Sequence, residues 1–215
     1  MNETLVVFAS REEFNVFFPN ISAVVASSTP IPVGAKYDLA VCGVGMLEFS
    51  VNLSKILSRV CYKRVFLLGA CGAYYGHDLN VCDIVRVDSD IVGDMGVQTA
   101  EGHFVPWKDY SGSECVYMGE SPRTLPLSLA SVPSVAGVSV NCSSGTRYFS
   151  LRRSGMYSAD VETMEGAALF AVCQKFGVAG YQFRAVCCVV GSNPGEGKFV
   201  EALELLKSRV LDFIS

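Results

Sequence analysis

Histidine is nearly absent from this sequence, since only His77 and His103 occur among its 215 residues. Neither has a second potential ligand at a spacing typical of metal sites, so no zinc centre is expected. Positive charge is also scarce, because 17 Lys and Arg stand against 21 Asp and Glu, for a net charge of −4. This balance argues against a nucleic-acid groove or a polybasic membrane surface. We expect no nucleic-acid partner, no membrane partner, no metal and no cofactor.

Long hydrophobic runs are missing as well. The longest apolar stretch, from Val65 to Gly76, is interrupted by three glycines and is shorter than the roughly 20 residues that span a bilayer. No basic region precedes the short apolar run from Leu5 to Ala9, so no secretory signal is expected. The nine cysteines include no C-x-x-C pair. We expect them to be small buried side chains in a reducing cytoplasm.

Hydrophobic residues make up half of the chain and charged residues 18%, which is typical of a globular protein with a substantial core. We expect one domain, residues 1–215. Apolar strand-like segments alternate with helical patterns. Strands are expected at Thr4–Ala9, Asp38–Cys42, Arg64–Leu68, Val81–Val92, Val135–Asn141 and Val178–Val190. This order predicts an α/β fold with three layers, α-β-α, around a mixed, mostly parallel sheet.

The stretch from Gly93 to Pro133 shows no clear strand or helix period. It carries four prolines and the single tryptophan, Trp107, so loops are expected there. Loops on a rigid α/β scaffold often close over a substrate. We therefore expect a lid from this stretch.

Glu13 follows the first expected strand and has two interpretations. Ser10 can cap a helix, and a glutamate three residues later completes a capping box. Alternatively, Glu13 lies at the carboxyl end of a parallel strand, where open α/β sheets bind their ligands.

Two glycine-rich segments also follow expected strands. Gly43-Val44-Gly45 comes before a helix, and Gly69-Ala70-Cys71-Gly72-Ala73 follows the strand at Arg64–Leu68. Glycine allows the backbone to approach a ligand closely, and a turn before a helix presents free N–H groups. One such turn is weak evidence for a ligand site, but two in succession are stronger.

The run from Val161 to Ala168 places two carboxylates before an apolar, small-residue segment. We interpret it as the head of a buried helix that opens at Ser158–Asp160. A charge there is costly unless it is paired, although a helix N-terminus favours an anion. Glu165 is therefore either a satisfied structural carboxylate or one that faces a cavity. Glu162 is expected to be solvated or to cap the helix.

Four segments in order resemble the purine nucleoside phosphorylase and nucleosidase superfamily. They are Ala9–Glu13, Gly69–Gly72, Val161–Ala168 and Arg184–Val186. The Met-Glu-Gly-Ala-Ala core of the third segment is the most specific. The resemblance is greatest to futalosine hydrolase and to methylthioadenosine/S-adenosylhomocysteine nucleosidase.

This resemblance implies a role for each matching residue. Glu13 corresponds to the carboxylate that activates the attacking water, and Glu165 to the carboxylate that holds the ribose hydroxyls. Met164 corresponds to the residue packed against the sugar. These residue types suit the chemistry, because cleavage of a ribosyl C–N bond develops positive charge on the sugar and needs a base for the water.

Further positions complete the implied substrate site. Cys71 and Gly72 match the loop over the ribosyl and base region, and Arg184 belongs to the fourth segment. Residues 143–149 are expected to form a polar turn, in which Tyr148 falls where the family places an aromatic ring against the purine. The 5′ group of a substrate is expected to lie against the Gly93–Pro133 stretch.

Two departures from the family pattern are informative. Phosphorylases resemble one another in an arginine before the Gly69–Gly72 segment, but Leu67 stands there and cannot bind phosphate, which favours hydrolysis. The family also has an Asp or Asn four residues after Arg184, facing the purine N7, where this chain has Cys188. A thiol donates hydrogen bonds weakly. Either Cys188 donates weakly, or Asn193 supplies the contact, or the protein binds nucleoside with little turnover.

The resemblance implies a purine nucleosidase that acts on futalosine or 6-amino-6-deoxyfutalosine in menaquinone biosynthesis. The alternatives are a methylthioadenosine/S-adenosylhomocysteine nucleosidase and a non-catalytic nucleoside-binding module. The resemblance also implies a homodimer, in which a neighbouring chain can close the pocket.

Overall fold

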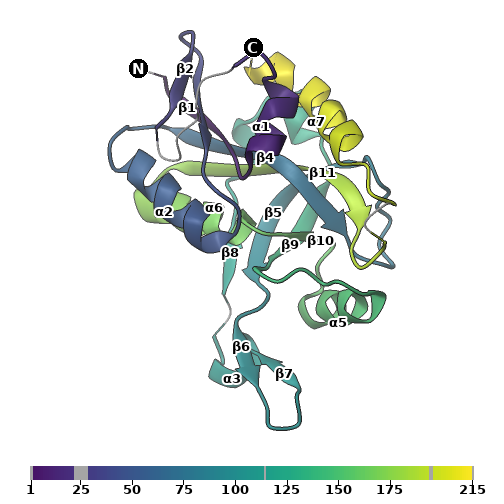
Figure 1. Ribbon diagram of the computed structural model, residues 1–215. Coiled ribbons are helices and arrows are strands. Elements are labelled where there is room, and N and C mark those ends of the chain that lie inside the picture. The colour runs from purple at the N-terminus through teal and green to yellow at the C-terminus, as the bar shows by residue number, and fades with distance from the viewer. Residues whose placement is uncertain (1, 22–28, 114, 194–195, 215) are drawn as a thin grey trace.

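The computed structural model describes residues 2–21, 29–113, 115–193 and 196–214 (Figure 1). In chain order the elements are β1 (Thr4–Phe8), α1 (Arg11–Phe17), β2 (Ile31–Val33), β3 (Tyr37–Val41), α2 (Met46–Leu57), β4 (Arg64–Ala73), β5 (Ile84–Val92), β6 (Gly96–Gln98), β7 (Phe104–Pro106), α3 (Trp107–Ser111), β8 (Val116–Met118), the 3-10 helix η1 (Pro122–Thr124), α4 (Leu127–Ala130), β9 (Ser134–Ser139), α5 (Arg147–Tyr157), β10 (Val161–Thr163), α6 (Gly166–Phe176), β11 (Ala179–Val189) and α7 (Phe199–Ile214). No helix among the described residues has both the length and the apolar character needed to cross a membrane.

A mixed sheet forms the centre of the molecule. Its strand order is β10-β9-β5-β11-β4-β1-β3-β2, with β8 paired to β5. The central pairs β3–β1, β1–β4 and β4–β11 are parallel, whereas β5 runs antiparallel to β11. Strand β10 also pairs with β4, so that β4, β11, β5, β9 and β10 form a closed ring. The predicted mixed α/β sheet is confirmed.

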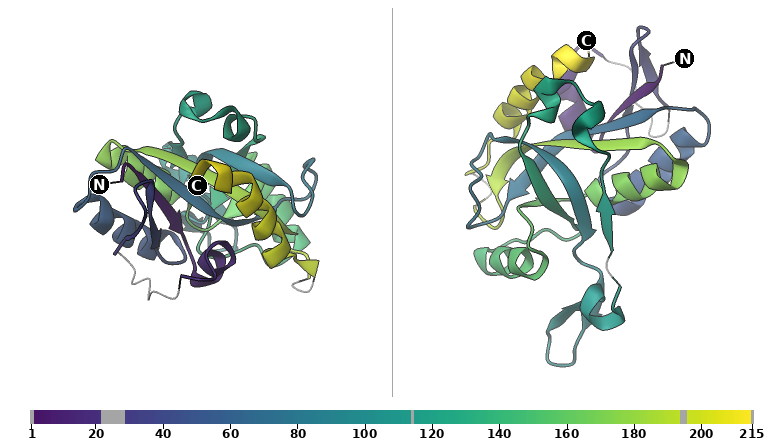
Figure 2. Two further views of the ribbon diagram at one scale, coloured as in Figure 1. Left: turned by 90° about the horizontal axis from the view of Figure 1, so that it is seen from above. Right: turned by 180° about the vertical axis from the view of Figure 1, so that it is seen from behind.

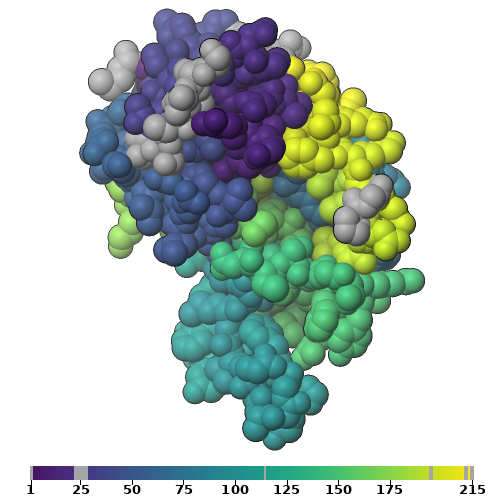
Figure 3. Space-filling view, in the orientation of Figure 1, coloured from purple at the N-terminus to yellow at the C-terminus, as the bar shows by residue number. Residues whose placement is uncertain are grey.

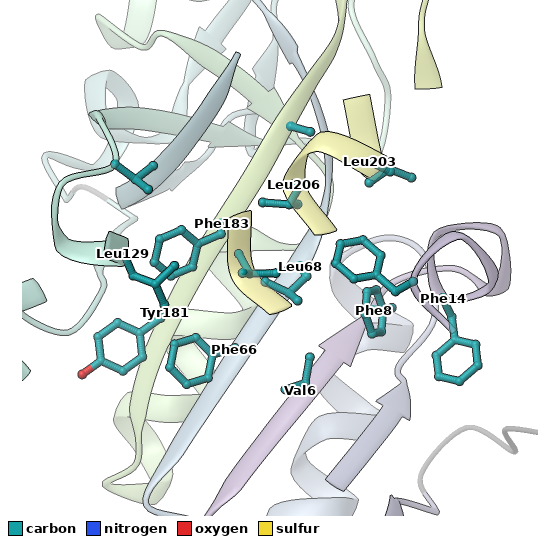
Figure 4. Close-up of a cluster of buried hydrophobic side chains, with 14 of the residues drawn as sticks. Val6, Phe8, Phe14, Phe66, Leu68, Leu129, Tyr181, Phe183, Leu203 and Leu206 are labelled. Atoms are coloured by element: carbon teal, nitrogen blue, oxygen red, sulfur yellow. The ribbon is translucent and has the colours of Figure 1, made fainter. Parts of the chain in front are cut away.

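Helices cover both faces of this sheet, because β1 is apolar on both of its faces. Val6 and Phe8 pack with α1 and α7, as Figure 4 shows, whereas Leu5 and Val7 pack with α2 and α6. Figure 2 shows these two helical layers on opposite sides of the sheet. All four side chains are fully buried, and each such burial stabilises the fold by about 1.5–3 kcal/mol. The predicted three-layer arrangement is confirmed.

Strand β4 is longer than predicted. The segment Gly69–Ala73 continues the strand and does not form a loop, with Gly69 opposite Arg184 and Gly72 opposite Cys188 on β11. The two glycines leave room for side chains from neighbouring elements. Glycine therefore serves close packing within a strand here, and its interpretation as a turn signal was wrong.

The boundaries around Glu165 also differ from those predicted. Val161–Thr163 is strand β10, and helix α6 begins at Gly166, so no helix opens at Ser158–Asp160. Tyr148, expected in a polar turn, lies in helix α5, where Thr146 accepts a hydrogen bond from Phe149 N–H as the N-cap. A short, fully buried strand between two helices carries too few residues to show a period of its own.

The predicted lid stretch contains short elements. Strands β6 and β7 form a hairpin that, together with α3, projects from the rest of the molecule (Figure 1), and Figure 3 shows this projection at the bottom of the molecule. Within α3, Trp107 packs against Tyr110 with ring centroids 5.7 Å apart.

Candidate active site

A cavity of about 560 Å³ opens at the carboxyl ends of β1, β4 and β11, beside the start of α6. This is the position at which open α/β sheets place their ligands. Residues singled out from the sequence line it, among them Glu13, Cys71, Gly72, Met164, Glu165, Arg184 and Cys188. The fold thus brings together residues from four separate segments of the chain.

Glu13 is held by backbone donors on two elements. Its Oε2 accepts hydrogen bonds from the N–H groups of Ala9 and Ser10, and its Oε1 accepts one from Ala70 N–H at 2.9 Å. Ser10 Oγ in turn accepts from Glu13 N–H, which completes the capping box. The two interpretations of Glu13 are therefore compatible, because one carboxylate both caps α1 and lines the cavity.

The protonation of Glu13 is shifted by its surroundings. Burial raises the pKa of the Glu13 carboxyl above its usual range. Arg184 and the backbone donors lower this pKa, whereas the nearby charge of Glu165 raises it further. A carboxylate with a raised pKa is a stronger base than an ordinary one.

Glu165 occupies the N-cap position of α6, but its side chain does not cap that helix. Its Oε1 accepts a hydrogen bond from Gly45 N–H at 3.0 Å, and its Oε2 accepts one from Arg184 Nη2 at 3.1 Å. The turn at Gly43–Gly45 thus presents a backbone donor to a protein carboxylate. Only 3% of Glu165 is exposed, so this charge is buried and paired at the cavity wall.

Arg184 connects the two carboxylates from a fully buried position. Its Nη1 lies 4.0 Å from Glu13 Oε1, and Nη2 contacts Glu165. Nη1 also donates to Ala70 O, and Nη2 to Gln182 Oε1. Although burial lowers the pKa of Arg184, the charges of the two glutamates outweigh it, and the pKa is raised.

Gly69 makes this arrangement possible. A Cβ atom at this position would overlap Glu13 Oε1 and lie 2.7 Å from Arg184 Nη1. No side chain can therefore replace glycine without separating the carboxylate from the guanidinium.

Cys188 and Gly72 lie opposite each other at the far side of the cavity. A Cβ on Gly72 would lie 3.5 Å from Cys188 Sγ. Asn193, the alternative donor, also lines the cavity, and its amide donates to Glu196 Oε1 at 3.0 Å.

Tyr148 is not brought to the site. It is 66% exposed on α5, where it packs against Phe149, and it does not line the cavity. Among the described lining residues the aromatic side chain is that of Phe199, at the start of α7. Phe199 was not singled out from the sequence, because its helical spacing with Leu203 is typical of a packed face and gives no signal for a ligand site. None of the described residues from 93 to 133 lines the cavity, so the predicted lid is not seen within this chain.

Glu162 was expected to be solvated or to cap a helix, and this expectation was wrong. It is 5% exposed on β10 and lines the cavity. Its carboxylate accepts hydrogen bonds from Ser143 Oγ, Ser144 N–H, Ser144 Oγ, Tyr74 Oη and Arg153 Nη1. Burial raises the pKa of Glu162, but the hydrogen bonds from the two serines and Tyr74 outweigh it and hold the pKa low. The anion ties the loop after β9 and helix α5 to the sheet.

Replacing Glu162 by glutamine should therefore make the protein less stable against unfolding. All hydrogen-bond partners of the Glu162 carboxylate are donors, so the NH2 group of a glutamine would face another donor. Arg153 would also lose its ion pair. We expect the free energy of unfolding to fall by about 3 kcal/mol. Urea denaturation measures it, with the exposed Glu12→Gln as control; equal stabilities of the two variants would contradict this role.

A second buried carboxylate, Asp90, lies behind the site. Its Oδ2 accepts hydrogen bonds from Thr163 Oγ1 and Gln182 Nε2, while its Oδ1 has no partner among the residues that the structure describes. A Cβ at Gly166 would overlap Asp90 Oδ2. This polar cluster thus explains the glycine after Met164 and Glu165.

Asp90 makes stability depend on pH. Burial raises the pKa of Asp90 from 3.8 to about 6, against the hydrogen bonds that lower it. The folded state then binds more protons than the unfolded state between these values, so stability falls as the pH rises from about 4 to about 6. The free energy of unfolding of wild type should fall by about 3 kcal/mol more over this pH range than that of Asp90→Asn. Urea denaturation of both proteins at pH values on either side of this window measures it, and parallel pH curves would contradict it.

No group of three or more His, Cys, Asp or Glu side chains within the described part of the chain is arranged to hold a metal ion. The arrangement instead provides a base, a second anion and a guanidinium around one cavity. Such a site can bind a polar ligand, activate a water molecule and stabilise developing positive charge.

The fold and the cavity define an α/β protein with a carboxylate-lined ligand site at its strand ends. The family model of the phosphorylase superfamily matches residues 32–212. The chain therefore belongs to the phosphorylase superfamily, as the sequence motifs predicted.

Solved structures with the same fold include enzymes from two bacteria. A 5′-methylthioadenosine/S-adenosylhomocysteine nucleosidase from Helicobacter pylori, in complex with butyl-thio-DADMe-Immucillin-A, is 19% identical, with 99% of each chain covered and a TM-score of 0.74. Futalosine hydrolase from Helicobacter pylori is 18% identical, with 99% and 98% covered and a TM-score of 0.74. A putative 5′-methylthioadenosine/S-adenosylhomocysteine nucleosidase from Francisella philomiragia is 14% identical, with 100% of this chain and 99% of that chain covered and a TM-score of 0.78. No curated protein matches the sequence significantly.

Proposed function

We propose that the protein is a purine nucleosidase, which hydrolyses the N-glycosidic bond of futalosine or 6-amino-6-deoxyfutalosine and releases the base. The observation that carries the proposal is the convergence of Glu13 and Glu165 on one cavity, with Arg184 between them. Cleavage of a ribosyl C–N bond needs a base for water and negative charge near the sugar.

Glu13 is the proposed base. Its backbone donors fix the carboxylate at the edge of the cavity, and its raised pKa suits it to accept a proton from water near neutral pH. The water then attacks the anomeric carbon as the bond to the purine breaks. Burial raises the pKa of Glu13, and the charge of Arg184 lowers it again. Arg184 therefore helps Glu13 to stay ionised.

Glu165 is proposed to bind the ribose hydroxyls. Gly45 N–H and Arg184 each occupy one of its oxygens, and a carboxylate has lone pairs left for two hydroxyl donors. Charge-assisted bonds of this kind strengthen as the sugar becomes positive. Met164, which precedes Glu165 and lines the cavity, is proposed to pack against the sugar.

The purine is proposed to lie toward Gly72 and Cys188, with the Cys188 thiol as the donor to its N7. Hydrolysis is proposed over phosphorolysis, because Leu67 is fully buried against α2 and α6 and Glu13 would repel a phosphate.

The choice of futalosine rests on the run Val-Glu-x-Met-Glu-Gly-Ala-Ala, in which Gly166 is required by the packing of Asp90. We accordingly propose that the enzyme acts in menaquinone biosynthesis by the futalosine route. Methylthioadenosine/S-adenosylhomocysteine nucleosidase is the second candidate, because the Helicobacter pylori enzyme with that activity shares the fold over 99% of this chain.

One assay tests these assignments. Purified protein is incubated with methylthioadenosine, S-adenosylhomocysteine, futalosine and aminodeoxyfutalosine, each with and without phosphate, and free base is measured. We expect base from the two futalosines alone, independent of phosphate. Release from the first two substrates would favour the second candidate, phosphate dependence would mean a phosphorylase, and binding without release would mean a nucleoside-binding module.

We also propose a homodimer through the α2 face. Leu47 and Val51 lie three and seven residues after Val44, and all three apolar side chains are more than half exposed. Val44 also lines the cavity, so a partner on this face would close the site. We include the projecting hairpin and α3 in the proposed interface, because α3 carries the exposed Tyr110.

Leu47→Asp should therefore convert a dimer into a monomer, since a charge would be buried in the interface. Sedimentation velocity measures the mass, with Leu127→Asp on α4 as a matched control at another highly exposed leucine. A wild-type monomer, or a dimer that survives Leu47→Asp, would contradict the proposed face.

A reducing cytoplasm is proposed as the location, because all nine cysteines are free. Alkylation of the protein in freshly lysed cells, before and after reduction, tests this; thiols that react only after reduction would contradict it.

A further inference from the structure

Two adjacent cysteines on β11 both line the cavity. Cys187 donates a hydrogen bond from its thiol to Cys188 Sγ, with the two sulfur atoms 3.7 Å apart. Neighbouring residues of a regular strand point to opposite faces, so both thiols could not normally reach one cavity. The described structure therefore departs from a regular strand at this point.

A β-bulge causes the departure. Val186 pairs with Cys71 and Cys188 pairs with Gly72, so Cys187 is an extra residue without a partner on β4. Its carbonyl instead accepts a hydrogen bond from Lys198 N–H, at the segment that leads into α7. Because Cys187 is outside the ladder, its backbone can rotate without breaking a strand pair.

The two thiols differ in acidity. The hydrogen bond from Cys187 lowers the pKa of Cys188 to about 7, although burial and the charge of Glu162 act against it. The same hydrogen bond and burial raise the pKa of Cys187. At neutral pH a larger fraction of Cys188 than of an ordinary cysteine is therefore thiolate.

We propose that Cys187 and Cys188 are a peroxide-sensitive modification site, in which Cys188 is oxidised first and Cys187 then closes a reversible disulfide. The Cys188 thiolate attacks one oxygen of hydrogen peroxide, the O–O bond breaks, and the second oxygen leaves as hydroxide and takes up a proton to form water. Cys188 is now a sulfenic acid. Cys187 loses its proton and attacks the Cys188 sulfur, the S–O bond breaks, and a second water leaves.

The bridge is expected to be readily reduced. Adjacent Cα atoms are about 3.8 Å apart, which is closer than the usual 4.4–6.8 Å of a disulfide, and strained disulfides are easily reduced. Closure rotates the Cys187 backbone and pulls on its bond to Lys198, next to the cavity residues Gly197 and Phe199. A further expectation rests on the proposed function: oxidation should stop turnover, because it removes the proton that the Cys188 thiol would donate.

A mass measurement tests the chemistry without any substrate. Native protein is treated with hydrogen peroxide at neutral pH, then denatured with N-ethylmaleimide and digested with trypsin. Cleavage after Arg184 and Lys198 gives peptide 185–198, which contains these two cysteines and no other. We expect this peptide to lose the mass of two hydrogens and to carry no maleimide, and to regain two reactive thiols after dithiothreitol.

The exposed Cys61 and Cys142 are the internal references, since each lies on a different tryptic peptide. Cys188 should be oxidised roughly ten-fold faster than either, from its larger thiolate fraction. Cys187→Ser should stop at a sulfenic acid that dimedone traps on Cys188. Cys188→Ser should leave Cys187 as slow as the references or slower.

Two results would overturn the proposal. One is peptide 185–198 taking up two maleimides at a peroxide dose that oxidises Cys61 and Cys142. The other is a disulfide from Cys187 or Cys188 to a third cysteine. Disulfide formation in a protein that cleaves no nucleoside would leave this proposal standing and refute only the proposed function, so the two failures are distinct.

Discussion

Glu13→Gln is expected to lower kcat for base release by about 10³-fold, with KM little changed. The amide cannot take the proton from water, and general-base catalysis typically contributes 10²–10⁴-fold. Glutamine keeps the length of the side chain and one acceptor oxygen, but its amide nitrogen would face a backbone N–H, so we expect the variant to fold with reduced stability. Steady-state assays of base release measure the loss, and circular dichroism confirms folding.

Glu12→Gln is the matched control, because Glu12 is the preceding residue but is exposed. It should leave kcat within about two-fold, as surface changes away from a site usually do. A Glu13→Gln enzyme with wild-type kcat would remove Glu13 from the chemistry.

The pH profile gives an independent test of the same residue. Burial raises the pKa of Glu13 above its usual 4.5, and catalysis needs the deprotonated form, so activity should fall with falling pH at a higher pH than an ordinary glutamate would give. An acid limb of kcat/KM at or below 4.5 would contradict the assignment.

Glu165→Gln is the second large effect, with an expected loss in kcat/KM of about 10²–10³-fold. The charge-assisted bonds to the ribose would weaken, and Arg184 would lose its close anionic partner in a fully buried position. The same assay measures it, with the exposed Glu201→Gln on α7 as control.

Loss of ribose binding must be separated from general damage to the site. For a substrate analogue that lacks one ribose hydroxyl, Glu165→Gln should lower kcat/KM much less than it does for the full substrate. The analogue already lacks the interaction that the substitution removes. Unchanged turnover of the full substrate by Glu165→Gln would show that the assignment of the ribose site is wrong.

The sequence predicted the parts of the site that depend on local rules. Glu13 follows an apolar strand and completes a capping box with Ser10, and both features are local. The alternation of strands and helices likewise predicted the layers, and parallel strand ends bring Glu13, Gly72 and Arg184 to one edge. Whether Glu165 was paired could not be predicted, because its partners Gly45 and Arg184 are distant in the chain.

The errors occurred where tertiary packing overrides a local signal. The glycines from residue 69 to 72 favoured a turn, yet the bulk of Glu13 and Arg184 requires a strand without side chains. Glu162 resembled a capping residue, but donors from three distant elements stabilise it inside the protein. Such contacts are set by the whole fold and leave no periodic mark in the sequence.

Helix α5 shows a third kind of limit. Its apolar residues do not gather on one face, so the pattern around Tyr148 indicated a turn, and two serines, Ser150 and Ser154, form its buried side. Tyr148 itself then lies outside the cavity. The position of an aromatic ring against a ligand cannot be carried over when the element that bears it is assigned wrongly.

The central claim is that water, activated by Glu13, cleaves the bond between a purine and its ribosyl group. Reaction of aminodeoxyfutalosine in water enriched in heavy oxygen, with phosphate present, tests it most directly by mass spectrometry of the released sugar. The account predicts a sugar that carries one heavy oxygen, formed by wild type and not by Glu13→Gln. An unlabelled sugar phosphate, or equal release by the two proteins, would contradict it.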